Sequence, residues 1–408
     1  MRLSFLKWLY PGMKVKRWIL LVFLGVLFII GASSLFLPSA FKVVRLLGWA
    51  VIGLCIIIIG IGISNIIASL INLFHPADGA KIVDIIYQKR FLGRGPKIVT
   101  VGGGTGLSVI LHGLKEYSNN ITAIVTVADD GGSSGRIREE FDILPPGDIR
   151  NCLVALADAE PLMRDLFQFR FDKESALEGH SFGNLFITAM TKLTGDFEKA
   201  VKESSKILAI RGRVIPATLN KVKLAAEFED GSRVLGEAKI PKKNVPISQV
   251  YLTPEGSQPT RDALQAIQEA EIIVMGPGSL YTSVIPNLLV KGITEAIVAS
   301  RVPKIYICNV MTQSGETDGY TAYDHVQALI SHTHKDVINT CIVNIAKAPS
   351  ELLERYEKEK SFPVKADSEK IRQMGYRVIE DEIISHTDFV RHDPDKLARI
   401  IVGTLVKH

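Results

Sequence analysis

The hydrophobic pattern of this chain changes at about residue 75. Before that point, residues 18–41 and 46–74 form two runs of 24 and 29 residues without Asp, Glu, Lys or Arg. A helix rises about 1.5 Å per residue, so roughly 20 residues cross the hydrocarbon core of a bilayer. The pattern therefore predicts a two-helix transmembrane anchor within residues 1–75. A cleaved signal peptide is the competing interpretation of the first run, but the length of that run and the presence of the second argue against it.

From residue 97 onward, short apolar runs alternate with helical patterns. Residues 97–101 form the first run, which leads into a glycine-rich turn and then into apolar residues at helical spacing. This order is typical of a strand, a turn and a helix in a parallel sheet. Further strands are predicted at residues 121–127, 272–275 and 304–308. Alternation with period two across residues 211–250 predicts a small β insertion.

These elements define the expected organisation of the chain. Residues 97–408 are predicted to form an α/β domain with a Rossmann-like, doubly wound, mainly parallel sheet and a small β insertion. Residues 76–96 are predicted to be a juxtamembrane linker, because Gly93, Gly95 and Pro96 break the preceding apolar segment.

The charge distribution sets the expected orientation. Residues 1–96 carry 11 Lys or Arg and 2 acidic residues, a net charge of +9, so the other 312 residues carry −4 of a total of +5. Basic residues lie before the first apolar run and after the second, which by the positive-inside rule places both chain ends in the cytoplasm. The net negative charge after residue 96 argues against a nucleic-acid partner. Four scattered cysteines without a CxxC pair indicate buried thiols in a reducing compartment.

Two glycine-rich loops follow predicted strands. Residues 102–106 read GGGTG and residues 276–283 read GPGSLYTS. Glycine lets a backbone approach a ligand closely, and the free N–H groups of a helix N-terminus attract phosphate. The first loop departs from the dinucleotide fingerprint because Leu107 stands at its third glycine position, which disfavours an NAD-dependent enzyme. A tight turn without a ligand is the structural alternative.

The loop after the second strand carries adjacent carboxylates. Residues 129–138 read DDGGSSGRIR, so Asp129 and Asp130 precede a flexible loop that bears hydroxyl groups. Two neighbouring acids could hold a divalent metal ion such as Mg²⁺, or a ribose. The alternative is an acidic turn that caps a helix over residues 135–141.

Three further polar stretches could contact a ligand. In PPGDIRN, Arg150 could bind phosphate through both guanidinium nitrogens or could pair with Asp148. His180 stands just before an apolar helix, where a single histidine is more often structural. Residues 309–317 are rich in amide and hydroxyl groups that suit a sugar or a ribose.

The remaining histidine pattern indicates surface. His332 and His334 form an HxH pair with no third ligand in view, so a solvated position is expected. Residue chemistry alone thus indicates a phosphate- or nucleotide-sugar-binding α/β domain and goes no further.

Six blocks, in order, resemble a known family: VGGGTGLS, TVADDGGSSGRIR, LPPGDIRNCLVALAD, GHSFGN, GPGSLYTSVIPNLL and NVMTQSGETDGYT. They resemble the YvcK-type gluconeogenesis factor family of the CofD-like 2-phospho-lactate transferase superfamily, over residues 97–408. The usual member of that family lacks a membrane hairpin. The resemblance implies a Rossmann-like protein that binds nucleotide sugars of the UDP-N-acetylglucosamine type, and it also places Tyr356 and Arg391 in the ligand site.

The resemblance also implies a role. It suggests a UDP-sugar-binding regulator that links carbon metabolism to cell-wall precursor supply and cell shape, here anchored in the cell membrane. A protein partner in cell-wall precursor synthesis and a homo-oligomer are compatible with it. The alternative is a Mg²⁺-dependent CofD-like phosphotransferase that uses a nucleoside-diphosphate-activated donor. In that case Asp129 and Asp130 would be the metal ligands. The sequence leaves open whether the chain is an enzyme. The candidate ligand-binding residues are Gly102, Gly103, Gly104, Thr105, Gly106, Asp129, Asp130, Ser133, Ser134, Asn151, His180, Asn184, Gly276, Gly278, Ser279, Tyr281, Thr282, Asn309, Thr312, Tyr356 and Arg391.

Overall fold

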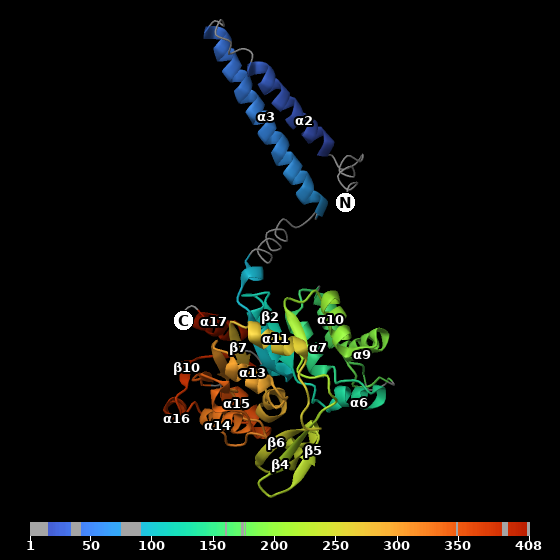
Figure 1. The fold of residues 1–408 in the computed structure, drawn as a ribbon, viewed down its shortest axis with the longest axis vertical. Helices are drawn as coiled ribbons and strands as arrows, with labels where there is room; N and C mark the ends of the chain where they lie inside the picture. The colour runs from blue at the N-terminus through green and yellow to red at the C-terminus, as the bar shows by residue number, and fades with distance from the viewer. Residues whose placement is uncertain are drawn as a thin grey trace. The chain divides into compact units, whose positions relative to one another are not determined.

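The chain divides into two compact units, Met1–Lys89 and Arg90–His408 (Figure 1). The computed structural model describes residues 15–33, 42–74, 91–159, 161–172, 175, 177–347, 350–385 and 391–405. Each unit is described by itself below.

The first unit is a pair of apolar helices, α2 (Val15–Ser33) and α3 (Lys42–Phe74). The helices pack closely because each presents a glycine to the other. A Cβ atom added to Gly25 would lie 2.7 Å from a side-chain carbon of Ile59, and one added to Gly62 would lie 2.6 Å from a side-chain carbon of Val22. Small residues that let backbones approach are typical of helix pairs in apolar surroundings.

One of the two helices is long and apolar enough to cross a bilayer. The qualifying stretch is Leu47–Ala68, with 22 residues in α3. In α2 the apolar stretch Arg17–Ala32 is shorter than a spanning helix, and residues 34–41 of the predicted first span lie outside the described residues. The structure therefore supports one candidate span, within the predicted second run, and does not support the predicted first span over residues 18–41.

The second unit is built on a seven-stranded sheet in the order β10-β9-β8-β7-β1-β2-β3, in which every neighbouring pair is parallel. Its strands are β1 (Ile98–Gly102), β2 (Ile121–Val125), β3 (Arg213–Pro216), β7 (Ile272–Met275), β8 (Lys304–Ile307), β9 (Thr340–Asn344) and β10 (Arg377–Asp381). Along the chain, β2 and β3 are added on one side of β1, and β7, β8, β9 and β10 are added later on the other side. Because crossover connections are right-handed, the two directions place helices on opposite faces, which confirms the Rossmann-like α/β fold.

Helices connect and cover the strands. They are α5 (Gly104–Leu114), α6 (Gly132–Phe141), α7 (Gly147–Leu156), α8 (Pro161–Gln168), α9 (Phe182–Thr194), α10 (Phe197–Ile207), α11 (Arg261–Glu269), α12 (Ile285–Leu288), α13 (Ile293–Ala299), α14 (Ala322–His332), α15 (Ser350–Lys358), α16 (Ser368–Gln373) and α17 (Pro394–Leu405). Single-turn helices are η2 (Leu92–Arg94), η3 (Glu237–Lys239), η4 (Pro241–Lys243), the π-turn η5 (Leu280–Val284) and η6 (Lys335–Val337).

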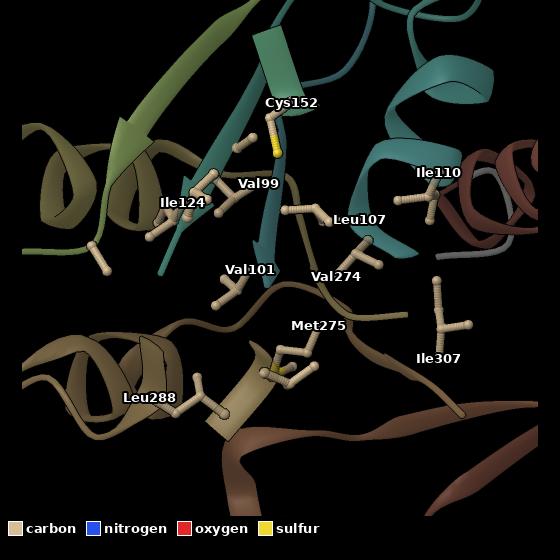
Figure 2. Packing of buried hydrophobic residues seen from close by; sticks show 14 of the residues in the cluster. Val99, Val101, Leu107, Ile110, Ile124, Cys152, Val274, Met275, Leu288 and Ile307 are labelled. Atoms are coloured by element: carbon tan, nitrogen blue, oxygen red, sulfur yellow. The ribbon is translucent and has the colours of Figure 1, made fainter. Parts of the chain in front are cut away.

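The core lies on both faces of the central strands. All residues of β1, β2, β7 and β8 are buried, as expected for strands covered on both sides. Val101 of β1, Met275 of β7 and Leu107 of α5 pack in this core (Figure 2). All four cysteines are buried and free, which agrees with their predicted burial.

The predicted β insertion is an antiparallel sheet of β5-β4-β6, with β4 (Lys223–Phe228), β5 (Arg233–Leu235) and β6 (Ile247–Thr253). Two details of the prediction are wrong. Residues 213–216 were expected in the insertion, but they form β3 at the edge of the main sheet. His332 is only partly exposed, since its Nε2 accepts a 3.1 Å hydrogen bond from the Val250 N–H and burial lowers the pKa of its ring, whereas His334 is exposed as predicted.

Candidate functional site

The candidate site lies where the strand order reverses. β1 and β7 are neighbours in the sheet, and the chain leaves them in opposite directions, toward β2 and toward β8. Loops at the carboxyl ends of two such strands diverge and leave a crevice, which is where open α/β sheets bind ligands. The two predicted glycine-rich loops are the loops at this point.

The two loops touch through glycines. A Cβ atom on Gly106 would lie 2.5 Å from the carbonyl oxygen of Pro277 and 2.8 Å from Cα of Gly278. Gly104 has a φ of +63°, in the left-handed region that favours glycine. Glycine is therefore required both for contact between the loops and for the turn into α5.

A cavity of about 320 Å³ opens beside these loops. Its walls come from the ends of β1, β7 and β8 and from the C-terminal part of the chain. The lining residues are Gly103, Gly104, Thr105, Gly106, Val109, Pro277, Gly278, Ser279, Ser283, Asn309, Val310, Met311, Thr312, Gln313, Tyr356, Ser361, Arg391 and His392.

The cavity has a polar wall and an apolar end. On the polar wall, Gln313 donates a 2.7 Å hydrogen bond to Ser279 Oγ, and the Gly278 N–H donates to Asn309 Oδ1 at 3.2 Å. At the apolar end, Val310 and Met311 belong to a small hydrophobic cluster against which Tyr356 packs. One end therefore suits phosphate and sugar groups, and the other suits a flat base.

The loop after β2 is built differently, because its polar groups bind one another. Asp129 accepts the Gly131 N–H at 2.9 Å, and Asp130 accepts the Ala238 N–H of η3 at 2.9 Å. Ser133 Oγ lies 3.0 Å from His180 Nδ1 and accepts a 3.1 Å hydrogen bond from Asn184 Nδ2. These five residues do not line the cavity.

Arg150 is also engaged inside the protein. Its guanidinium donates to Ser181 Oγ and, at 2.7 Å, to Asn151 Oδ1. The sequence offered two interpretations of Arg150, a phosphate contact and an ion pair with Asp148. The contacts of Arg150 in the part of the protein that the structure describes include no ion pair with Asp148.

Behind the glycine loops lies a group of five carboxyls, called here the acidic group: Asp129, Asp130, Asp148, Glu237 and Glu316. Burial is the main cause that raises the pKa of four of them. The pKa rises to about 7 for Asp148 and Glu316 and to about 8 for Glu237, and that of Asp129 is raised as well. Clusters of perturbed acids are common at functional sites but also occur in structural networks.

Comparison with known proteins identifies the family. A family model described as 2-phospho-L-lactate transferase CofD matches residues 98–384. This chain belongs to the CofD family. The match includes both glycine loops and the whole acidic group.

Curated CofD-family relatives carry a more specific name. The "Gluconeogenesis factor" of Bacillus subtilis (strain 168) is 53% identical over 315 residues, which cover 77% of this chain and 99% of that protein. The "Putative gluconeogenesis factor" of Nostoc sp. (strain PCC 7120) is 47% identical over 417 residues, covering 97% of this chain and 91% of that protein. A crystal structure of a UPF0052 family member from Bacillus halodurans has a TM-score of 0.73 and 50% identity, and covers 75% of this chain and 99% of that chain. The resemblance to gluconeogenesis factors noted in the sequence is thereby confirmed.

The structure brings about half of the predicted site residues of this CofD-family member to the cavity. Those that line it are Gly103, Gly104, Thr105, Gly106, Gly278, Ser279, Asn309, Thr312, Tyr356 and Arg391. Those that do not line it are Gly102, Asp129, Asp130, Ser133, Ser134, Asn151, His180, Asn184, Gly276, Tyr281 and Thr282. Thr282 instead donates to the Glu316 carboxylate at 3.2 Å, and the Tyr281 hydroxyl lies 2.8 Å from that of Tyr320.

The predicted magnesium ligands of the CofD-like alternative are Asp129 and Asp130. Their carboxylates bind backbone N–H groups of different segments, the turn at Gly131 and η3 of the insertion. Within the described residues, no three His, Cys, Asp or Glu side chains are grouped so as to hold a metal ion. Because Mg²⁺ usually takes only one or two protein carboxylates together with substrate phosphates and water, a magnesium ion at this pair stays a prediction.

Sequence reasoning missed residues that reach the site from distant segments. Ser361 and His392 line the cavity, and Glu237 joins the acidic group from the β insertion. None stands in a glycine-rich or otherwise distinctive motif. Only the packing of the C-terminal elements and of η3 onto the strand ends brings them there.

Proposed function

We propose that this CofD-family protein is a nucleotide-sugar-binding regulator and that its ligand, of the UDP-N-acetylglucosamine type, occupies the cavity beside the glycine loops. The observation that carries the proposal is the cavity's division into a glycine-loop wall and an apolar end with Tyr356. Backbone N–H groups at the start of α5 suit a diphosphate. An aromatic ring at the other end suits a uracil base.

Arg391 completes the proposed contacts. It lines the same cavity as Tyr356. A guanidinium offers a planar pair of donors that matches a phosphate or the carbonyl edge of a base. The amide and hydroxyl groups of Asn309, Thr312 and Gln313 then face the ribose or the sugar.

The N-terminal unit is proposed to be a membrane anchor in which both uncharged runs, residues 18–41 and 46–74, cross the bilayer, so that both chain ends lie in the cytoplasm. The support is the apolar stretch Leu47–Ala68, the 24-residue length of the first uncharged run, and the Lys and Arg residues before the first run and after the second. The B. subtilis relative matches 77% of this chain over 99% of its own length, and the Nostoc relative matches 97% of this chain, so the relatives differ in how much of the chain they share. Reporter fusions test the topology: one at the C-terminus is expected in the cytoplasm and one near Ser39 outside, and an external C-terminus would contradict it.

Regulation is proposed to act through a protein partner in cell-wall precursor synthesis, with carbon metabolism as the input. The name of the relatives, gluconeogenesis factor, supports a metabolic role. The same cavity would serve a transferase, as the family model's description suggests. Incubation of the purified chain with nucleoside-diphosphate donors separates the two, because a regulator leaves the donor intact.

The direct test is calorimetry on the full chain in detergent with UDP-N-acetylglucosamine, GDP and NAD. We expect the UDP-sugar to bind and the other two to bind more weakly. Tyr356→Ala should weaken UDP-sugar binding by an amount typical of base stacking, about 1–3 kcal/mol. Tyr356→Phe is the matched control, since it keeps the ring and should bind like the parent. Equal UDP-sugar binding by the parent, Tyr356→Ala and Tyr356→Phe would refute the site.

A further inference from the structure

The two outer strands of the seven-stranded sheet are protected to different degrees. At one edge, β3 is short, ends at Pro216 and has its last three residues buried. At the other edge, β10 has β9 on one side and no described strand on the other, and none of its five residues is buried. Figure 1 shows β10 at the margin of the unit, beside α16. An open edge strand is a template for pairing with another strand.

The backbone of β10 offers a defined set of hydrogen-bonding groups at this edge. The Arg377 N–H and the Asp381 carbonyl oxygen form hydrogen bonds of 3.0 and 3.1 Å with the residues that flank β9. Both bonds point toward β9, and the backbone groups of a strand alternate in direction from one residue to the next. Those of Val378 and Glu380 therefore point away from β9, toward the open edge.

The side chains of β10 are basic at its start and acidic at its end, because its sequence is RVIED. Arg377 and Asp381 are exposed, and among the described residues neither takes part in an ion pair. One carboxylate oxygen of Asp381 accepts the Glu382 N–H at 2.7 Å, which leaves the other for a cation. The neighbouring acid, Glu380, is held by Arg372 of α16 at 3.0 Å. The two ends of β10 thus carry opposite charges that are available to a partner.

One two-fold register suits both the backbone and these charges. Residues of antiparallel strands whose backbone groups face each other exchange two hydrogen bonds. If Val378 of one copy lies opposite Glu380 of the other, the outward-facing residues of both copies are used and Ile379 lies at the axis. Arg377 then lies opposite Asp381 in both halves. A shift by two residues in either direction shortens the ladder and places Arg377 opposite an isoleucine.

We propose that β10 is a dimerisation edge, at which a second copy of this chain adds its own β10 in antiparallel orientation and joins the two seven-stranded sheets into one. Charge complementarity identifies the occupant. Charges on an edge strand discourage pairing with unrelated strands, whereas RVIED meets its own reversed sequence with opposite signs at both ends. The interface is isologous, as in most two-fold dimers. It goes beyond the proposed function and does not depend on the identity of any ligand.

A pair of cysteines tests the register in the full chain in detergent. Arg377→Cys combined with Asp381→Cys places thiols opposite each other across the axis, at a Cα separation of about 4.5 Å that suits a disulfide. Within one copy the two positions are about 13 Å apart, too far to bridge. We expect mild oxidation to convert this variant to a covalent dimer. Each single-cysteine variant should stay monomeric, because its thiols are equally far apart in the dimer.

The cysteine test has its own controls. The native cysteines are buried, so the parent sets the background of cross-linking. Five residues on each side bury little surface, and oxidation traps even a weak, reversible pair. Association through the apolar helices would affect all variants equally and cannot produce a difference between them. If the double variant forms no covalent dimer, or if the single variants form one equally fast, the proposal is overturned.

Charge exchange tests the same edge without a covalent bond. Arg377→Asp and Asp381→Arg each place like charges opposite each other in both halves, and each should raise the dissociation constant of the dimer more than about tenfold. A mixture of the two variants presents only opposite charges and should form a mixed dimer. Energy transfer between fluorescently labelled copies in detergent measures both effects. Arg261→Asp, which changes an exposed arginine at the start of α11, should pair like the parent.

Folding and pairing are separated in each variant. No residue of β10 lines the cavity, so UDP-N-acetylglucosamine binding, where the parent shows it, should be unchanged in every variant that folds. If the Asp381 variants do not fold, position 377 alone decides: Arg377→Asp should lose pairing and Arg377→Lys should keep it. Equal pairing by Arg377→Asp and Arg377→Lys, or a mixture of the charge variants that pairs no better than either alone, would overturn the proposal.

Discussion

Two kinds of loop follow strands of the main sheet: the glycine loops after β1 and β7, and the DDGGSSG loop after β2. Both kinds carry polar groups, but those groups have different surroundings in the structure. Gly103–Gly106 and Gly278–Ser279 line a cavity. In the DDGGSSG loop, Asp129, Asp130 and Ser133 bind other parts of the protein.

This comparison shows what turns a polar loop into a binding site. A buried polar group costs little when it is paired, and a paired group has little left to offer a ligand. The loops at the switch point border a cavity, so their residues are accessible to a ligand there. The loop after β2 has η3, α7 and α9 in front of it instead, so its polar groups contribute to the stability of the fold.

The largest effect is expected from Gly106→Ala. The new Cβ would lie 2.5 Å from the Pro277 carbonyl oxygen, which is backbone and cannot turn away. We expect UDP-N-acetylglucosamine binding to fall below detection, because the two loops must separate. Overpacking of this kind should also lower the free energy of unfolding by about 1–3 kcal/mol.

Calorimetry and urea denaturation check this prediction, with Gly403→Ala as the control. Gly403 lies in α17 and has no heavy atom within 4 Å of a built Cβ, so its substitution should leave binding unchanged. Gly104→Val is a poor probe, because the φ of +63° at Gly104 would strain any branched side chain. Normal binding by Gly106→Ala would show that the loops do not need their contact.

A second prediction concerns His392, a cavity residue whose ring nitrogen forms a hydrogen bond within the protein. His392 lines the cavity, but its ring donates a hydrogen bond from Nε2 to the Cys308 carbonyl oxygen at 3.1 Å, and burial lowers its pKa to about 4. The unfolded chain binds this proton near pH 6.5. The stability contribution is therefore full above pH 6.5 and is lost as the pH falls toward 4.

The size of this loss is about 1.4 kcal/mol per unit of pKa difference, or about 3 kcal/mol. Urea denaturation between pH 7 and pH 4 should show a shallower acid loss in His392→Gln than in the parent. His325 and His332 also have lowered pKa values, so they decrease stability as the pH falls in the parent and in the variant alike. Asp148 has a raised pKa, and its contribution changes in the opposite direction. An unchanged acid slope in the variant would show that His392 is not the titrating group.

The third prediction tests whether Asp130 serves the fold. Asp130→Ala removes the acceptor of the Ala238 N–H, which ties η3 to the end of β2. We expect the free energy of unfolding to fall by about 1–3 kcal/mol, the cost of an unpaired donor, and amide exchange to accelerate in residues 236–243. UDP-sugar affinity should change less than threefold. Glu255→Ala, which changes an exposed acid in the turn after β6, should change stability by less than about 0.5 kcal/mol. If Asp130→Ala lost UDP-sugar binding without losing stability, Asp130 would be a ligand contact and not a residue that serves the fold.

The sequence predicted the parts of the fold that have a local signature. Residues 272–275 were predicted as a strand and form β7, and the runs at 97–101 and 121–127 match β1 and β2 to within two residues at each end. Such buried parallel strands are short apolar runs bounded by glycines, which is a strong local pattern. β3 was assigned to the insertion instead, because its four residues give no local sign that they pair with β2.

The site was predictable only where it follows directly from a strand end. The loops after β1, β7 and β8 were found, since parallel strands place their carboxyl ends at one edge. His392 and Glu237 were missed because tertiary packing alone brings them to the site. The pairing of the polar groups in the DDGGSSG loop could not be predicted either, because it depends on segments such as η3 that are remote in sequence.

The smallest effects come from a matched pair of serines, one in each of the compared regions. Ser133 is buried and contacts His180 and Asn184, whereas Ser279 lies in the cavity wall and accepts a 2.7 Å hydrogen bond from Gln313. Ser133→Ala should cost about 1–2 kcal/mol of stability, because the Asn184 amide loses a buried acceptor, and should leave UDP-sugar affinity unchanged.

Ser279→Ala should show the reverse. Gln313 is only part-buried and can turn to the cavity, so stability should change by less than about 0.5 kcal/mol, while the ligand loses one hydroxyl contact worth about 0.5–1.5 kcal/mol. Urea denaturation and calorimetry on both variants measure the two quantities side by side. If Ser133→Ala weakened binding as much as Ser279→Ala at equal stability, the polar groups of the loop after β2 would contact the ligand directly, and the contrast between the two regions would fail.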